Sequence, residues 1–183
     1  MKMIAFAGLA KAGKSTLSKH CLTQGNLLHP QSQTLRSFAE PIKHSLNVFG
    51  VRKETHPVVY REIAQFIGNR MREHDPDHWV KQFDLRVQED KHFAKVLWND
   101  DTRYINEIEY FKKHNGVLVF VDAKTRINPD FNKFPYNHAS ERIAKEFYEK
   151  EEIRNMFDVV IDGNSGVDAA IGEITEKVLK YTF

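Results

Sequence analysis

The stretch MIAFAGLAKAGKST, residues 3–16, decides the fold, because an apolar run leads directly into a glycine-rich turn and a helix start. Residues 3–7 have the composition of a short strand that is buried on both faces. Gly8, four further residues, Gly13, Lys14 and Ser15 match the pattern G-x-x-x-x-G-K-[ST]. In such a loop glycines let backbone N–H groups close around phosphate oxygens, lysine adds charge, and the hydroxyl binds Mg²⁺. The stretch therefore predicts a phosphate-binding loop (P-loop).

Length and composition are those of a globular protein with one domain. The chain has 183 residues, 41% hydrophobic and 28% charged, and its formal net charge of +2 is too small to indicate nucleic acid or a membrane as a partner. Cys21 is the only cysteine, which excludes an intrachain disulfide and suits a reducing cytoplasm. Lys11 and Lys14 interrupt the first apolar run, and no run reaches the roughly 18 apolar residues of a membrane span. We therefore expect a cytoplasmic protein without a signal peptide.

Short apolar runs alternate with longer amphipathic ones, which predicts an α/β fold. The expected strands are 3–7, 34–38, 94–98, 117–121 and 158–161. The expected helices are 14–23, 40–49, 58–73, 76–91, 103–114, 139–150 and 167–181. Asp75 before Pro76 suggests an N-cap followed by proline at the first helical position. Residues 122–137 contain two prolines and three asparagines, and we expect them to form a surface lid.

Two acidic residues follow the third apolar run, in the segment KVLWNDD. Asp100 and Asp101 stand where a P-loop enzyme places an aspartate that organises Mg²⁺. Alternatively, the two carboxylates only favour the N-terminus of the next helix. The residues alone leave both alternatives open.

The expected helix over 58–73 has a polar face. Arg61, Gln65, Gly68 and Arg72 fall within about 60° of one another, because each residue advances a helix by about 100°. A stripe for core packing lies opposite: Ile63, Ala64, Ile67 and Met71. Arginine can hold a phosphate with two hydrogen bonds, and glutamine can pair with a base edge. The same face would also suit plain solvent exposure.

Taken together, these segments resemble the deoxynucleoside monophosphate kinases of tailed bacteriophages, a group of P-loop nucleoside monophosphate kinases. The resemblance spans nearly the whole chain in order and is carried by GLAKAGKST (8–16), SFAEPIKHSL (37–46), REIAQFIGNRMREHDPDHWV (61–80), DDTRYINEIEYFKKHNG (100–116) and HASE (138–141). It implies a three-layer α/β/α fold with a five-stranded, mostly parallel sheet. It also implies a helical acceptor-binding region at about 40–92 and a short lid at about 122–137, all within one kinase domain.

The resemblance implies ATP as phosphate donor, Mg²⁺ as cofactor, and a role for each matching residue. ATP would be held by the P-loop and by a residue near its base: Gly8, Lys11, Ala12, Gly13, Lys14, Ser15, Thr16 and Asn164. Ser15 and Asp101 would hold the metal, with Asp101 chosen because DTRYINE also aligns Arg103, Asn106 and Glu107. The acceptor monophosphate would be bound by Lys43, Arg61, Gln65 and Arg72. Lys14 with Arg103 or the lid residue Arg126 would stabilise the transferring phosphoryl group.

Other functions remain to be separated from this one. Phosphomevalonate kinases of animals share the arginine–glutamine–glycine–arginine helix, so another small phosphate monoester is an alternative acceptor. A switch GTPase is disfavoured, because NKFP at 132–135 lacks the aspartate of the guanine-reading NKxD segment. A nucleotide-binding module or NTPase without an acceptor is the third alternative, which the intact lysine and hydroxyl argue against. A homodimer is compatible with the resemblance, and nucleic acid or membrane partners are not expected.

Overall fold

Strand β1 (Lys2–Ala7) is the centre of a five-stranded parallel sheet whose order is β2-β3-β1-β4-β5. The computed structural model describes residues 1–28, 32–133 and 136–178. The other strands are β2 (Gln33–Arg36), β3 (Val96–Thr102), β4 (Val117–Asp122) and β5 (Val159–Asp162). Because every pairing in the sheet is parallel, the carboxyl ends of all five strands meet at one edge.

Contacts divide the chain into two units. The first unit is Met1–Arg36 with Asp90–Phe183, and the second is Ser37–Glu89. The first unit contains the sheet and six helices: α1 (Lys14–Leu28), α5 (Ile105–Lys113), α6 (Lys124–Ile127), α7 (Ala139–Glu149), α8 (Glu151–Arg154) and α9 (Val167–Lys177). The second unit contains α2 (Glu40–Val48), α3 (Pro57–His74) and nearly all of α4 (His78–Asp90).

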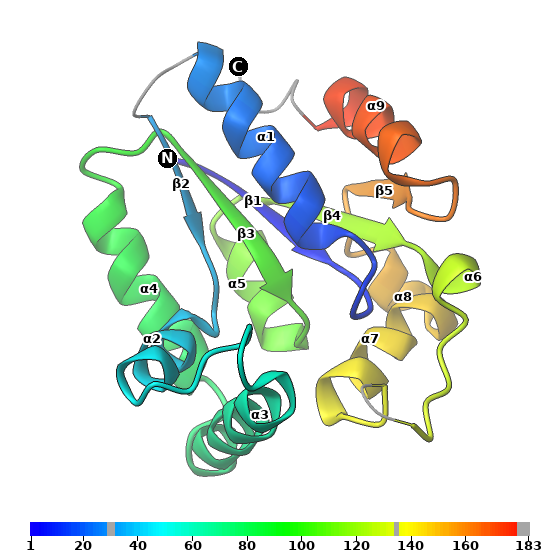
Figure 1. The fold of residues 1–183 in the computed structure, drawn as a ribbon. Coiled ribbons are helices and arrows are strands. Elements are labelled where there is room, and N and C mark those ends of the chain that lie inside the picture. Colours follow the sequence, from blue (N-terminus) through cyan, green and yellow to red (C-terminus); the bar gives the residue numbers. More distant parts are fainter. Residues whose placement is uncertain (29–31, 134–135, 179–183) are drawn as a thin grey trace. The chain divides into compact units, whose positions relative to one another are not determined.

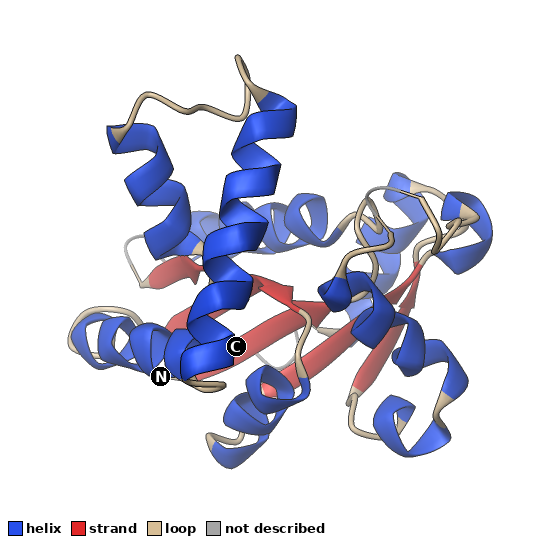
Figure 2. Cartoon of the chain, turned by 90° about the horizontal axis from the view of Figure 1, so that it is seen from below, coloured by secondary structure: helices blue, strands red, loops and turns tan. Residues whose placement is uncertain are grey.

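Helices cover both faces of the sheet in the first unit, which makes it a three-layer structure (Figures 1 and 2). On one face, α1 and α9 pack against alternate strand residues such as Ile4, Phe6 and Val121. On the other face, Phe120 stacks on Phe157 with ring centroids 5.2 Å apart and meets Phe147 of α7 edge-on. Burial on both faces explains why the strands read as continuous apolar runs. The expected fold class is confirmed, and the sheet is entirely parallel.

The second unit has its own small core. Phe38 and Phe83 stack with ring centroids 4.3 Å apart, and both are buried, as are Ile42 and Leu46 of α2. The indole N–H of Trp79 on α4 donates to the carbonyl of Gly68 on α3 at 3.0 Å. Trp79 thus joins two helices through a backbone carbonyl of α3.

A bidentate ion pair lies at the two points where the chain leaves and re-enters the first unit. Nε and Nη2 of Arg36 contact the two carboxylate oxygens of Asp90 at 2.7 and 2.8 Å. The Asp90 side chain is 0% exposed and that of Arg36 is 26% exposed. Two parallel hydrogen bonds of this kind fix orientation as well as charge, so β2 and the end of α4 are held together.

Several expected element boundaries were wrong by two or more residues, and for two of them the structure shows what differs locally. Helix α4 begins at His78 rather than Pro76, because Asp75 accepts a hydrogen bond from the Asp77 N–H in a local turn instead of capping a helix. Strand β3 continues through Asp100 and Asp101, which the sequence analysis had placed after it.

The later segments also differ from the expectation in detail. The expected lid, 122–137, contains the short helix α6, and its residues 134–135 lie outside the described part, as do residues 179–181 of the expected last helix. Within the described ranges, no helix has the length and apolar character that crossing a bilayer requires.

Candidate phosphoryl-transfer site

The P-loop connects β1 to α1 with three residues in left-handed conformations: Gly8 (φ 139°), Lys11 (φ 65°) and Gly13 (φ 100°). A side chain at Gly8 would place its Cβ 2.7 Å from the carbonyl oxygen of Val121, so the loop must pass this close to β4. At the start of α1, the N–H groups of Thr16 and Leu17 donate to the carbonyl of Gly13 at 3.0 Å each. Left-handed turns that lead into a helix N-terminus form a concave backbone site suited to an anion.

Lys14 is the buried cation of this loop. Its Nζ donates to the carbonyls of Gly8 at 2.9 Å and Leu9 at 2.8 Å, and the residue is 6% exposed. Burial, and after it the nearby Arg103 guanidinium, lower the pKa of Lys14, and the carboxylates of Glu141, Asp100 and Asp101 raise it; the net result is a pKa of about 7. The lysine is therefore poised to gain a full charge when an anion arrives. Ser15 and Thr16, which follow it, are exposed in the first turn of α1.

Asp101 is held by the buried amide of Asn99. The Asn99 Nδ2 donates to Oδ1 of Asp101 and to the carbonyl of Arg36, both at 3.0 Å, and its Oδ1 accepts from the Asp101 N–H. These bonds fix the direction of the carboxylate at the point where the register of β3 on β1 shifts, between the pairs Ala5–Asn99 and Ala7–Thr102.

An oxygen donor set such as Ser15 and Asp101 fits Mg²⁺, which prefers one or two protein ligands plus phosphate oxygens. The described residues contain no group of three or more His, Cys, Asp or Glu that could hold a metal ion. Metal binding by Ser15 and Asp101 stays a prediction.

Arg103 follows β3 and is fixed at its backbone and at its guanidinium. The Glu107 carboxylate accepts the N–H groups of Arg103 at 2.7 Å and Tyr104 at 3.0 Å. Nη1 of Arg103 contacts Oε1 of the buried Glu141 and donates to the Ser140 hydroxyl at 3.3 Å. The first unit thus brings the predicted residues Lys14 and Arg103 close together.

Arg126 on α6 binds carbonyl groups of two other loops. Its Nε donates to Gly163 at 2.7 Å, and its Nη2 donates to Lys11 and Ala12 at 3.2 Å each. Its own N–H donates to Oδ1 of Asn164 at 3.0 Å. The expected lid arginine and the expected base-side asparagine are therefore neighbours beside the P-loop. A role for Arg126 at the transferring phosphoryl group stays a prediction. It requires the guanidinium to release these carbonyl groups and to bind phosphate oxygens instead.

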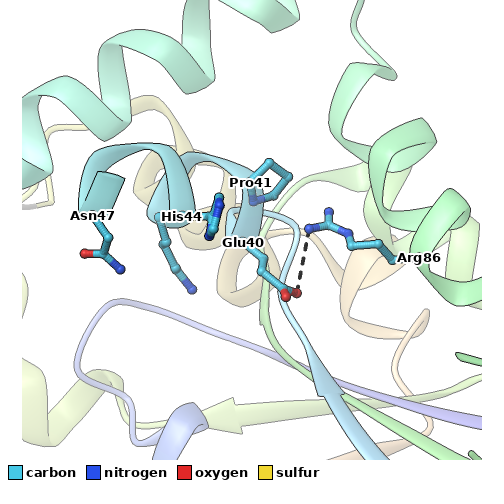
Figure 3. A pocket seen from close by; sticks show the side chains of 6 residues that line it. Glu40, Pro41, His44, Asn47 and Arg86 are labelled. Atoms are coloured by element: carbon cyan, nitrogen blue, oxygen red, sulfur yellow. Dashed lines mark ion pairs between the residues drawn. The ribbon is translucent and has the colours of Figure 1, made fainter. Parts of the chain in front are cut away.

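In the second unit, one face of α2 forms a polar pocket of about 380 Å³ with Arg86 of α4 (Figure 3). Glu40, Lys43, His44 and Asn47 project from this face at helical spacing. Nη1 of Arg86 lies 3.7 Å from Oε2 of Glu40, a long ion pair. Lys43, predicted on the acceptor side, donates from Nζ to the Ser37 hydroxyl at 3.1 Å. With two permanent cations and one carboxylate, the pocket suits an anionic group.

The remaining predicted acceptor residues lie on α3 and do not line this pocket. Arg61, Gln65 and Arg72 are half-buried, and Nη1 of Arg72 donates to the carbonyl of Gly68 at 3.2 Å on its own helix. Ile67 and Met71 line a separate apolar pocket of about 210 Å³ with Trp79. Gly68, expected on a solvent face, is instead the buried residue of α3.

Sequence reasoning assigned no role to Glu141 or Asn99. Glu141 stands three residues after His138, which caps α7 by accepting the Ser140 N–H at 3.2 Å. That spacing predicts a local capping role for the glutamate. In the structure Glu141 instead contacts the P-loop across 131 residues of sequence, at the Ala10 N–H. Only the fold could reveal this contact.

The parallel sheet and the P-loop together define the class of fold: it is that of the P-loop kinases of small molecules. Shikimate kinase from Bacteroides thetaiotaomicron resembles the chain with a TM-score of 0.50 and 12% identity, and the match covers 98% of each chain. Shikimate kinase from Aquifex aeolicus vf5 gives 0.51 and 16%, covering 97% of this chain and 96% of that one. Identities this low establish the fold and leave the acceptor open.

A third solved structure, dephospho-CoA kinase from Campylobacter jejuni, gives a TM-score of 0.46 with 12% identity over the whole of this chain and 98% of the other. No protein-family model matches the chain. No curated protein matches it in sequence either.

Proposed function

We propose that the protein transfers the terminal phosphoryl group of ATP to a (deoxy)nucleoside 5′-monophosphate, giving the diphosphate. The observation that carries the proposal is the P-loop with its buried Lys14 beside the anchored Arg103. A loop that only turned the chain would need neither a buried lysine nor a second cation next to it.

Phosphoryl transfer requires cations that are held in position, and the chain has residues that could supply them. In phosphoryl transfer, negative charge spreads over the equatorial oxygens, so cations that are held in place stabilise the transition state. Lys14 and the N–H groups at the start of α1 would hold the donor phosphates. Mg²⁺, when bound through Ser15 and Asp101, supplies charge neutralisation at the β- and γ-phosphates. The acceptor phosphate is itself anionic at neutral pH, so no protein nucleophile is required.

The acceptor residues belong to the second unit in this proposal. Lys43, Arg61, Gln65 and Arg72 would bind the monophosphate, and Arg86 would add a cation beside Lys43 in the polar pocket. A nucleoside monophosphate offers both a phosphate for the arginines and a base edge for the glutamine. Any phosphate monoester shares the first feature, so only acceptor selectivity separates nucleotides from the alternative.

The test is a panel of acceptors scored by ADP release with Mg·ATP as donor. The panel contains deoxy- and ribonucleoside monophosphates, phosphomevalonate as a different phosphate monoester, and shikimate as a hydroxyl acceptor. Stimulation by one or more nucleoside monophosphates, lost in Lys14→Ala, is the expected result. Stimulation by another member alone, or steady ADP release without any acceptor, would refute the proposal.

A further inference from the structure

Glu141 is a buried carboxylate to which the phosphoryl-transfer proposal gives no task. Its side chain is 3% exposed, yet it is not in an apolar environment. Its Oε2 accepts the N–H of Ala10 in the P-loop at 2.7 Å, and its Oε1 contacts Nη1 of Arg103. A single carboxylate on α7 therefore joins the P-loop to Arg103, which follows β3.

The contact leaves most of the Arg103 guanidinium available. Among the described residues, only Nη1 of the five-donor guanidinium has hydrogen-bond partners, Glu141 and Ser140. The Arg103 side chain is 29% exposed, so its other donors face a region that solvent or a ligand can enter. The Glu107 carboxylate fixes the backbone of the same residue. Arg103 is thus oriented at both ends while it keeps donors for an anion.

We propose that Glu141 is a positioning residue for phosphoryl transfer: it holds Arg103 and the Ala10 N–H in the arrangement in which Arg103 stabilises the transferring phosphoryl group. This inference rests on the proposed function. The carboxylate acts in two ways. It restricts a long side chain that otherwise loses conformational entropy on binding the anion, and its negative charge offsets the repulsion between Arg103 and Lys14.

A neutral isostere of Glu141 distinguishes this positioning role from a purely structural contact. Glu141→Gln keeps the volume of the side chain but cannot accept from both Ala10 and Arg103, because one end of the amide is a donor. We expect kcat to fall about 30-fold with KM for ATP changed less than about threefold, as for loss of one aligned donor in the transition state. Glu141→Asp, which retains the charge, should recover part of kcat. Glu146→Gln, on the same helix in an ion pair with Lys150, is the matched control and should leave kcat unchanged.

A double-mutant cycle tests whether Glu141 acts through Arg103. Arg103→Met alone should lower kcat about 100-fold or more, and adding Glu141→Gln to it should cost less than about threefold further, since coupled residues are not additive. Multiplicative losses would overturn the proposal, as would equal changes of kcat and thermal stability in Glu141→Gln and Glu146→Gln.

If Glu141→Gln fails to fold, Ser140→Ala provides the cycle instead. This substitution removes the second acceptor of Nη1 and leaves the carboxylate in place. Its smaller loss of kcat should also disappear in Arg103→Met, and a loss that persists there overturns the proposal.

The wild-type acceptor panel separates failure of the inference from failure of the proposed function. If no nucleoside monophosphate is phosphorylated, the proposed function fails, and the same cycle is measured on ATP hydrolysis, which uses the same donor loop. Coupling between Glu141 and Arg103 in hydrolysis would retain the positioning role, and additivity would exclude it.

Discussion

The protonation of Lys14 offers a direct measurement of how nucleotide binding changes the P-loop. Burial, and after it the Arg103 guanidinium, lower the pKa of Lys14 to about 7. A bound polyphosphate is a close anion and should return the pKa of this lysine toward its ordinary value of 10.5. Nucleotide binding above neutral pH must therefore take up a proton.

The size of the uptake follows from these two values. At pH 8 a lysine of pKa about 7 is only about one-tenth protonated, so binding should take up about 0.9 proton per site. At pH 6 the uptake should fall to about 0.1 proton. The dissociation constant should rise about 50-fold from pH 7 to pH 9, because most free protein must first protonate Lys14.

Titration calorimetry with ADP in EDTA measures this uptake, using pairs of buffers that differ in ionisation enthalpy. EDTA removes any contribution from a bound metal, and the terminal phosphate of ADP is ionised throughout pH 7.5–9. Lys14→Met is the control: it should bind more weakly and take up no proton. Uptake below about 0.2 proton at pH 8 in the wild type would refute the argument from burial.

The same pKa predicts how the stability of the empty protein depends on pH. The folded value lies below the unfolded one, so the unfolded chain binds more protons between pH 7 and 10.5, and stability rises with pH across that window. Relative to Lys14→Met, the wild type should gain about 2 kcal/mol from pH 7 to pH 9. Urea unfolding at both pH values measures the difference, and saturating nucleotide should abolish it.

Four substitutions test other parts of the structure. Gly8→Ala should cost about 2–4 kcal/mol of unfolding free energy, because residue 8 has a left-handed conformation and the new Cβ would lie 2.7 Å from the Val121 oxygen. Gly13→Ala, with open space around the new Cβ, should cost about 1–2 kcal/mol. Equal losses of the two variants in urea titrations would contradict this reasoning. Asp90→Ala leaves the partly exposed Arg36 without its bidentate partner and should cost about 3 kcal/mol of unfolding free energy. An unchanged unfolding free energy in urea titrations would show that the ion pair does not stabilise the fold. Arg72→Ala should raise KM for the monophosphate at least tenfold with KM for ATP nearly unchanged, and equal rises would remove Arg72 from the acceptor side.

Local chemistry made the fold predictable from the sequence. The three central strands β3, β1 and β4 contain apolar runs that are buried on both faces, and the P-loop pattern fixes the turn after β1, so the class of fold follows from short-range signals. Boundaries were less predictable where a side chain competes with the expected element. β3 continues beyond its expected end, where the Asn99 side chain accepts the Asp101 N–H, and Asp75 forms a local turn where a helix cap was expected. Such outcomes depend on which of two similar hydrogen bonds the tertiary structure favours.

The candidate site was predictable only where its residues belong to one segment. Lys14 could be identified because the P-loop motif is continuous, while the contact between Glu141 and Ala10 joins residues 131 positions apart. Gly68 shows the same limit, since helical periodicity placed it on a polar face, but packing by Ile42 and Trp79 buries it. Periodicity reports which residues share a face and not what covers that face.

The charges around the P-loop bear on the proposed binding of a metal. Lys14 and Arg103 lie among three carboxylates, those of Glu141, Asp100 and Asp101. This set is already more negative than positive, so a polyphosphate alone adds anions to a region that has no surplus of cations. A divalent cation beside Asp101 would reverse that balance and let the carboxylates stabilise the complex instead of opposing it. The same acidic residues that discourage metal-free nucleotide would thus favour the metal complex, and affinity for ADP should increase when Mg²⁺ replaces EDTA, by an amount that Asp101→Asn reduces.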